Sequence, residues 1–304
     1  MEIRTYRPGD EAAQAHIYNV AAAALPGFKP ATAEEIARRY RADDDPMSRF
    51  YAVEGDRVIG YATFSPSGRI SYPWCLPDAP DRREPLLDAL LAAMTRRGLG
   101  AAWAAYRADW GPILTFFEEH GFARERAMIN YEAERERLPR TPIPEGLRIE
   151  PLAREDLPRV QALGRGLFAV KDAEALGAFY GENPDFEPSS LFALRREADG
   201  AILGAGLAII DPKYADPTKL DAAMPCFRLG AFGTETERHK RVNGLVSVVG
   251  VTETAGEVLL AEAARRLAAA GLARAAAQAP SDRPDLCGLY DRYLRRQGAF
   301  PILR

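Results

Sequence analysis

The side chains suited to covalent catalysis or metal binding are few in this sequence and lie far apart. Its histidines are His16, His120 and His239, and none forms a recognisable nucleophile motif with a cysteine or serine. The sequence therefore gives no support for covalent catalysis. The cysteines are odd in number and scattered, which favours neither a disulfide framework nor a zinc site and fits a reduced, cytoplasmic protein. They are Cys75, Cys226 and Cys287.

Arginines are the groups that could bind an anion. Arg82 and Arg83 stand just before an apolar helical stripe, where they could form charge-assisted hydrogen bonds with a phosphate or be solvated at the start of the helix. The basic run Arg238–Arg241 is short, and a solvated loop explains it more simply than a phosphate contact. A net charge of -3 gives no electrostatic reason to expect a nucleic-acid partner.

Length and hydropathy indicate the number of domains and whether a membrane span is expected. A chain of 304 residues has room for about two domains, each able to bury a core of its own. The amino terminus lacks the basic and apolar regions of a signal peptide. The Ala-rich stretch 261–279 is interrupted by Arg265, Arg266 and Arg274, so no membrane span is expected.

The order of predicted elements occurs twice. Each half opens with a strand that leads into a charged turn, at Ile3–Asp10 and Leu147–Arg154. Each half closes with an Ala-rich strand and a helix that runs into a glycine-phenylalanine corner, at Trp110–Phe122 and Leu286–Phe300. An internal duplication of this kind predicts two similar domains.

Prolines mark the boundary between these domains. Pro139, Pro142 and Pro144 remove main-chain donors and favour an extended chain. The expected domains are residues 1–138 and 147–304, joined by a linker at 139–146.

Hydrophobic periodicity and capping signals give the elements of the first half. Thr32 and Glu35 have the spacing of a capping box, which predicts that a helix begins behind Thr32. The expected strands are 3–7, 50–53, 58–64, 69–76, 101–106 and 127–133, and the expected helices are 10–24, 33–41, 84–97 and the one ending at Gly121.

The second half repeats this order with an inserted stretch, Asp211–Pro225. The expected helices are 154–168, 173–180, 256–270 and the closing one, and the expected strands are the opening one, 191–195, 202–210, 227–232, 245–251 and 273–277. Four residues follow Phe300, so little or no final strand is expected. An uncovered sheet edge would result, and the two halves are therefore expected to share strands.

This order of elements resembles the GNAT superfamily of N-acetyltransferases, and its duplication resembles the tandem, mycothiol-synthase-like members. The resemblance covers nearly the whole chain. It implies an α/β (α+β) fold of two GNAT-like domains, each with a mixed, mostly antiparallel central sheet flanked by helices. It also implies acetyl-CoA as co-substrate and a small-molecule amine or a peptide as acceptor, in a monomer or a homodimer.

In this family, a loop with the pattern Arg/Gln-x-x-Gly-x-Gly/Ala precedes the third helix. Its main-chain N–H groups and the helix N-terminus bind the pyrophosphate of acetyl-CoA. In the first half, Arg82 falls on the first position of the pattern and Arg83 follows it. Pro85 and Leu87 take the glycine positions and Glu84 adds a negative charge, so phosphate binding there is weakened.

In the second half, Thr254 and Gly256 take the glycine positions of this pattern and Val251 replaces the Arg/Gln. A second alignment, on Arg241 and Gly244, is followed by β-branched residues rather than by a helix. The resemblance thus implies acetyl-CoA contacts in the second domain, and Gly256 is alternatively a glycine at a helix start. The implied contacts are Val249, Val251, Thr254, Ala255, Gly256 and Glu257.

The general acid of this family is a tyrosine on the closing helix, four residues before the glycine of the corner. Phe117 takes that position in the first half and has no proton to donate. In the second half, Tyr293 stands five residues before Gly298, as the acid or as a packed aromatic side chain. Tyr290, one turn earlier, is a further candidate.

Two functions are compatible with these residues. One is an acetyl-CoA-dependent N-acetyltransferase whose second domain carries the chemistry, with Glu253 as a candidate base. The other is a degenerate pair of domains that binds CoA or another small ligand as a sensor or scaffold, which the departures in both loops favour. No cluster of charged or aromatic residues selects the acceptor amine.

Overall fold

The computed structural model describes residues 2–42, 45–164, 172–174, 176–177, 188–210, 244–250 and 252–304. Val251, the insertion Asp211–Pro225, the predicted strand at 227–232, the run Arg238–Arg241 and most of the predicted helix at 173–180 lie outside these residues. Residue contacts divide the chain into two compact units. Unit 1 is Met1–Arg126 with Phe300–Arg304, and unit 2 is Ala127–Ala299.

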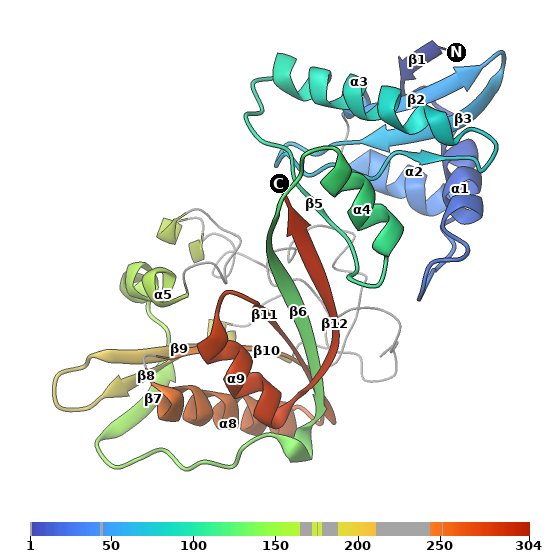
Figure 1. The fold of residues 1–304 in the computed structure, drawn as a ribbon. Helices are drawn as coiled ribbons and strands as arrows, with labels where there is room; N and C mark the ends of the chain where they lie inside the picture. Colours follow the sequence, from blue (N-terminus) through green and yellow to red (C-terminus); the bar gives the residue numbers. More distant parts are fainter. Residues whose placement is uncertain are drawn as a thin grey trace. The chain divides into compact units, whose positions relative to one another are not determined.

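Unit 1 contains a four-stranded antiparallel sheet with helices on both faces. The strand order is β1 (Glu2–Thr5), β2 (Arg49–Glu54), β3 (Arg57–Thr63) and β4 (Trp74–Cys75). Figure 1 shows α1 (Asp10–Ala21) and α2 (Ala33–Ala42) on one face and α3 (Arg83–Arg96) on the other. β5 (Ala104–Ala105) and α4 (Gly111–Glu119) complete the order.

The two faces of this sheet follow from the alternation of side chains along its strands. Tyr51 faces α1, where its hydroxyl donates to Gln14 at 2.6 Å. Gly60 faces α3, and a Cβ there would come within 3.0 Å of Leu86. The predicted capping box is confirmed at the start of α2, because Thr32 N donates to Glu35 Oε2 (3.0 Å) and Glu35 N to Thr32 Oγ1 (3.1 Å).

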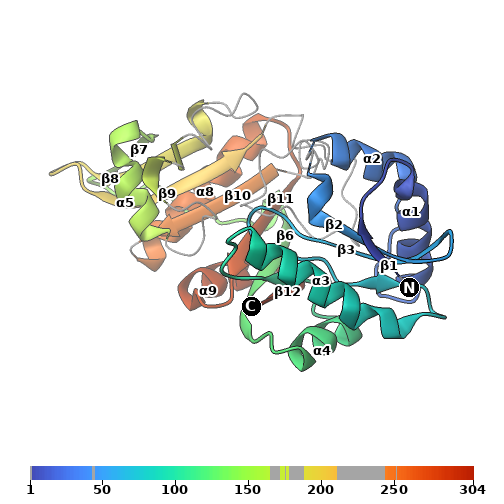
Figure 2. The ribbon, with the colours of Figure 1, turned by 90° about the horizontal axis from the view of Figure 1, so that it is seen from above.

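Unit 2 is built on one mixed sheet. Along this sheet, β6 (Arg124–Glu134) is followed by β11 (Arg274–Pro280), β10 (Gly244–Gly250), β9 (Ile202–Ile209), β8 (Leu191–Arg196) and β7 (Leu147–Pro151). Figure 2 shows β8, β9 and β10 side by side. α8 (Glu253–Ala269) packs on β9 and β10 and touches α9 (Pro284–Tyr293), and α5 (Leu157–Leu163) packs on β9.

The end of the second half differs from the expectation that the closing helix reaches Gly298. α9 ends at Tyr293, and the chain continues directly as β12 (Arg295–Leu303), a strand of nine residues. The prediction of little or no final strand was therefore wrong. Gly298 lies inside β12, whereas Gly121 has a φ of 86° and terminates α4 as the corner requires.

β6 and β12 each contribute to both units. Residues 128–134 of β6 pair with β11 in unit 2. At the carboxyl end of β12, Leu303 pairs with Ala104 of β5. The next residue, Arg304, exchanges two main-chain hydrogen bonds with Ala123, and all of these residues belong to unit 1. Strands of the two halves of the sequence thus pair with one another, and residues 139–146, where the sequence predicts the linker, belong to unit 2.

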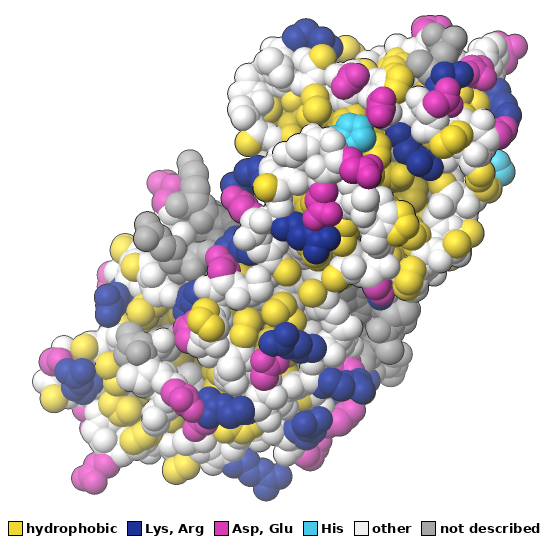
Figure 3. Space-filling view, in the orientation of Figure 1, with side chains coloured by type: hydrophobic (Ala, Val, Ile, Leu, Met, Phe, Trp, Pro, Cys, Tyr) yellow, Lys and Arg dark blue, Asp and Glu magenta, His cyan; other side chains and the backbone are white. Residues whose placement is uncertain are grey.

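Charges of both signs lie on the face of the molecule that Figure 3 shows. On the face shown in Figure 3, the Lys and Arg side chains lie interspersed with those of Asp and Glu. Within the described part of the chain, no helix is long and apolar enough to cross a membrane. Among the same residues, no group of His, Cys, Asp and Glu side chains is arranged to hold a metal ion.

Burial in unit 1 favours the neutral forms of several acidic side chains, Cys75 and Tyr106 among them, and this predicts that the protein loses stability at alkaline pH. Burial raises the pKa of Cys75 from 9.0 to about 12 and that of Tyr106 from 10.0 to about 12. Because both pKa values are higher in the folded protein, the contribution to stability is complete below pH 9 and is lost as the pH rises toward 12. We expect the free energy of unfolding, measured in urea at a series of pH values, to fall over this range. Identical ultraviolet titrations of folded and urea-unfolded tyrosines would contradict the assignment.

Candidate functional site

The sheet of unit 2 opens between its two parallel strands. Gly244 pairs with Ala275 and Leu245 with Ala276, and beyond these residues the described parts of β10 and β11 are not paired. Strands that separate leave main-chain groups in need of other partners. In β10, the N–H of Val248 donates instead to the hydroxyl of Tyr290 on α9, at 3.2 Å.

A cavity of about 490 Å³ lies at the carboxyl end of β10. It is enclosed by the end of that strand, the first turn of α8, and α9 with the residue before it. The lining residues are Val248–Gly250, Thr252, Glu253, Gly256, Arg283–Leu286, Gly288, Leu289 and Arg292.

The amino terminus of α8 forms one wall of this cavity. Thr252 caps the helix, because its Oγ1 accepts a hydrogen bond from Ala255 N at 3.1 Å. A helix of 17 residues carries a partial positive charge at this end, which favours an anion. Gly256 allows α8 and α9 to approach closely, since a Cβ there would lie 2.9 Å from Leu289 Cδ2.

Two arginines bring positive charge to the cavity, and each is paired. Arg292 reaches from α9 to the first turn of α8, where it pairs with Glu253 and, at 3.2 Å, with Glu257. Arg283 pairs with Asp285 at 2.8 Å. Glu253 thus occupies, with its own carboxylate, the position at which the helix favours an anion.

The two tyrosines of α9 have different surroundings. Tyr293 donates to Glu257 Oε1 at 2.8 Å, and burial together with this hydrogen bond raises its pKa. Tyr290 is fully buried and stands seven residues after Arg283, the N-cap of α9. Phe117 stands seven residues after Trp110, the N-cap of α4, so Tyr290 is its counterpart. The five-residue spacing that favoured Tyr293 depended on Gly298, which lies in β12.

The structure places the remaining predicted contacts of the second half around α8. Val249 lines the cavity, but its carbonyl faces β9, where a Cβ on Gly204 would lie 2.5 Å from it. Because N–H and C=O of alternate residues point to opposite sides of a strand, Val248 and Gly250 present theirs to the opening instead. Thr254 is exposed and outside the lining, and Ala255 is buried.

Sequence reasoning missed the cavity residues of α9 and of the preceding turn. Arg283, Gly288 and Arg292 belong to no pattern in the sequence that marks a ligand site. The available signal was Pro284, which is typical of the first position of a helix and places Arg283 at its start.

In unit 1, the side chains of the predicted contacts Arg82 and Arg83 are engaged with other residues of the unit. Arg82 pairs with Glu54 at 3.0 Å and with Asp81 at 2.7 Å, and Arg83 lies over the ring of Tyr72. Where the strands of this unit separate, the N–H of Tyr72 donates to the hydroxyl of Tyr106 at 2.5 Å. A cluster of stacked and edge-on rings fills the space around this bond; it comprises Tyr72, Trp74, Tyr106, Trp110, Phe116 and Phe117.

Comparison with solved structures identifies the fold. The chain is similar over 99% of its length to a GCN5-related N-acetyltransferase from Sphaerobacter thermophilus, with a TM-score of 0.65, 17% identity and 94% of that chain covered. It is also similar over 99% of its length to a GCN5-related glucosamine N-acetyltransferase region in a fungal multi-domain GH3 β-N-acetylglucosaminidase, with a TM-score of 0.61, 10% identity and 38% of that chain covered. No protein-family model and no curated protein matches the sequence. The chain therefore has the fold of the GCN5-related N-acetyltransferases, as the resemblance implied.

Proposed function

We propose that the protein is an acetyl-CoA-dependent N-acetyltransferase whose working site is the cavity of unit 2. One observation carries this proposal: β10 and β11 separate beside a cavity that is closed by the amino terminus of α8. The opening exposes main-chain groups that can hold an extended amide-containing chain. The helix terminus favours the phosphates at the end of such a chain.

The residues of this cavity fit acetyl-CoA by shape and in part by charge. Gly250 and Gly256 bring no side chain into the cavity at the end of β10 and the start of α8. Arg283 and Arg292 can bind phosphate once they exchange their present carboxylate partners. Glu253 opposes phosphate binding, so we expect a weaker affinity than a glycine-rich loop would give.

Acetyl-CoA supplies an acetyl group that is activated as a thioester. The acceptor nitrogen must lose a proton as it bonds to the acetyl carbon, and the sulfur must gain one as its bond to that carbon breaks. Tyr290 is our candidate to provide the second proton, because its oxygen already accepts the Val248 N–H at the opening. A hydrogen bond donated to that oxygen also stabilises the phenolate that remains.

In this proposal, unit 1 has a structural role and does not bind acetyl-CoA. Its ring cluster fills the region that corresponds to the opening in unit 2, and Arg82 is committed to two carboxylates. The acceptor is proposed to be a small-molecule amine or a peptide, and we expect one acetyl-CoA site per chain.

Calorimetric titration of the purified chain with acetyl-CoA tests the proposal, followed by assays of acetyl transfer to small amines and peptide N-termini. One bound molecule per chain and transfer to at least one amine are expected. Binding without transfer to any amine would favour the alternative of a ligand-binding sensor or scaffold. An absence of binding at millimolar acetyl-CoA would rule out the cavity.

Removing the negative charge of Glu253 is expected to tighten acetyl-CoA binding. Glu253→Gln removes one of the two carboxylate partners of Arg292 and the repulsion at the amino terminus of α8, so we expect a gain of about tenfold, or about 1.4 kcal/mol. Glu34→Gln, in the first turn of α2 in unit 1, is the matched control and should leave the affinity unchanged. Equal or weaker binding by Glu253→Gln would show that the phosphates bind elsewhere.

A further inference from the structure

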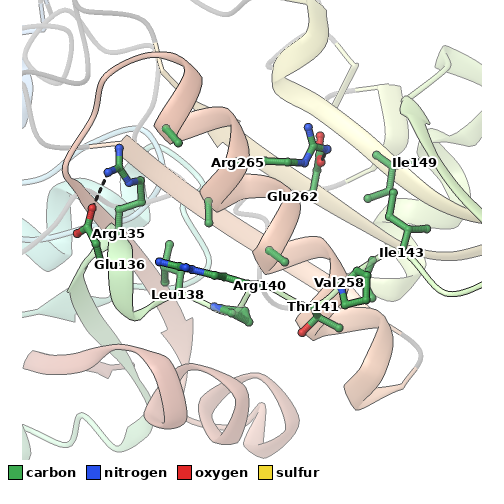
Figure 4. Close-up of a pocket in the computed structure, with 15 residues that line it drawn as sticks. Arg135, Glu136, Leu138, Arg140, Thr141, Ile143, Ile149, Val258, Glu262 and Arg265 are labelled. Atoms are coloured by element: carbon green, nitrogen blue, oxygen red, sulfur yellow. Dashed lines mark hydrogen bonds and ion pairs between the residues drawn. The ribbon is translucent and has the colours of Figure 1, made fainter.

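We propose that unit 2 carries a second ligand site, for a molecule with an anionic head and an apolar body such as a medium-chain fatty acid. The site is a groove of about 520 Å³ between α8 and the segment Arg135–Ile143, which we call the strap (Figure 4). Small-molecule sites in proteins have volumes of roughly 300–1,000 Å³, so the groove has a suitable size.

The floor of the groove is apolar. α8 contributes Val258 and the alanines 261, 264 and 268, and the strap contributes Leu138. The alanines leave space that larger side chains would fill. Ile143 lies at the rim with 43% of its surface exposed, and a ligand with an apolar body would remove this surface from water.

One arginine of the groove, Arg140, is not held in an ion pair with a described residue, although its charge is among the causes that lower the pKa of Glu136, after that residue's own main-chain hydrogen bond and Arg135. Glu136 pairs with Arg135 at 2.5 Å, and the buried Glu262 is held by Arg265 and by Arg266, the latter at 2.6 Å. Arg140 forms no ion pair with any residue that the structure describes. In Figure 4, its side chain lies in the middle of the lining residues, with Arg135 and Glu136 to one side and Ile143 and Ile149 to the other.

The charge and the floor together select the ligand. A guanidinium binds a carboxylate through two parallel hydrogen bonds, which gives Arg140 the geometry to hold an anionic head. The neighbouring apolar surface then accommodates the rest of the molecule. A neutral lipid would lack the hydrogen bonds from Arg140, and a small inorganic anion would lack the contact with the apolar surface.

The strap is shaped so that the groove stays open. Arg135 N donates to Ala273 O at 2.8 Å, which anchors the start of the strap. Beyond Leu138, the described hydrogen bonds do not tie the main chain of residues 139–143 to α8. Pro139 and Pro142 instead keep this stretch extended through their fixed φ angles.

This groove is separate from the cavity proposed for acetyl-CoA. That cavity uses the first turn of α8, whereas the groove uses Val258–Ala268 further along the helix. Decanoate is therefore expected to bind equally well to a variant in which the acetyl-CoA cavity is blocked, Gly288→Phe. The two proposals can fail independently.

Calorimetric titration of the full chain with decanoate, and with decanol as a neutral counterpart, tests the inference. We expect decanoate to bind and Arg140→Gln to weaken it by about tenfold or more, with little effect on decanol. Ala268→Trp should block both by filling the groove. The matched controls are Arg137→Gln on the exposed side of the strap and Ala269→Trp on the exposed side of α8, neither of which lines the groove.

Three results would overturn the proposal. The first is a failure of decanoate to bind at millimolar concentration, and the second is binding of decanoate to Arg140→Gln as tight as to the wild type. Equal losses in Arg140→Gln and Arg137→Gln would show a non-specific attraction to surface charge. Thermal melts of each variant identify any that fail to fold, and the Arg140 and Arg137 pair remains informative because both side chains are exposed.

Discussion

Replacing Gly288 with phenylalanine is expected to abolish acetyl-CoA binding without unfolding the protein. Gly288 lies on α9 in the cavity lining, and a Cβ built on it meets no atom within 4 Å. A large side chain at this position therefore extends into the cavity rather than into the core. We expect a loss of at least about 100-fold in affinity, or about 2.7 kcal/mol, measured by calorimetric titration.

Gly288→Ala is the matched control at the same position. A methyl group leaves most of the cavity free, so the affinity should stay within about twofold of the wild type. Alanine also favours the helix over glycine by up to about 1 kcal/mol, which should raise the melting temperature. Gly111→Phe, at a helical glycine of unit 1 that is equally open, tests for a general effect of the substitution. Unchanged affinity in Gly288→Phe would mean that acetyl-CoA binds at another place.

Tyr290→Phe is expected to lower kcat for acetyl transfer by about 100-fold, since a positioned general acid contributes roughly 10²–10⁴-fold. The substitution keeps the edge-on contact with the ring of Tyr131, at a centroid distance of 5.4 Å. It removes the hydroxyl that accepts the Val248 N–H, and leaving that donor unpaired should cost about 1–3 kcal/mol of stability. The variant should therefore be assayed well below its melting temperature.

Tyr293→Phe distinguishes a chemical role from a structural one. Its hydroxyl donates to Glu257, whereas the hydroxyl of Tyr290 accepts the Val248 N–H at the opening, so kcat should change by less than about twofold in Tyr293→Phe. Both variants should bind acetyl-CoA with near wild-type affinity. A larger loss of kcat in Tyr293→Phe would reverse the assignment.

The end of α9 is a feature that local sequence patterns predict incorrectly. Arg295, Arg296 and Gln297 are good helix formers, so propensity alone extends α9 toward Gly298. In the structure these residues belong to β12, whose main-chain partners come from strands more than a hundred residues earlier in the chain. Such long-range pairing overrides a local preference of a few tenths of a kcal/mol per residue. Because α9 ends earlier than the sequence predicts, the candidate general acid changes from Tyr293 to Tyr290.

The sequence by itself determined the features that depend on neighbours within one or two turns. The duplicated order of elements and the capping box at Thr32 and Glu35 follow from periodicity and caps. The mixed sheet with flanking helices was implied by the resemblance that this order carries. Tertiary structure alone decided where β10 leaves β11 and that Arg292 reaches Glu253. It also decided that β6 and β12 serve both units, because strand pairing and cavity walls join residues whose separation leaves no signal in a local pattern.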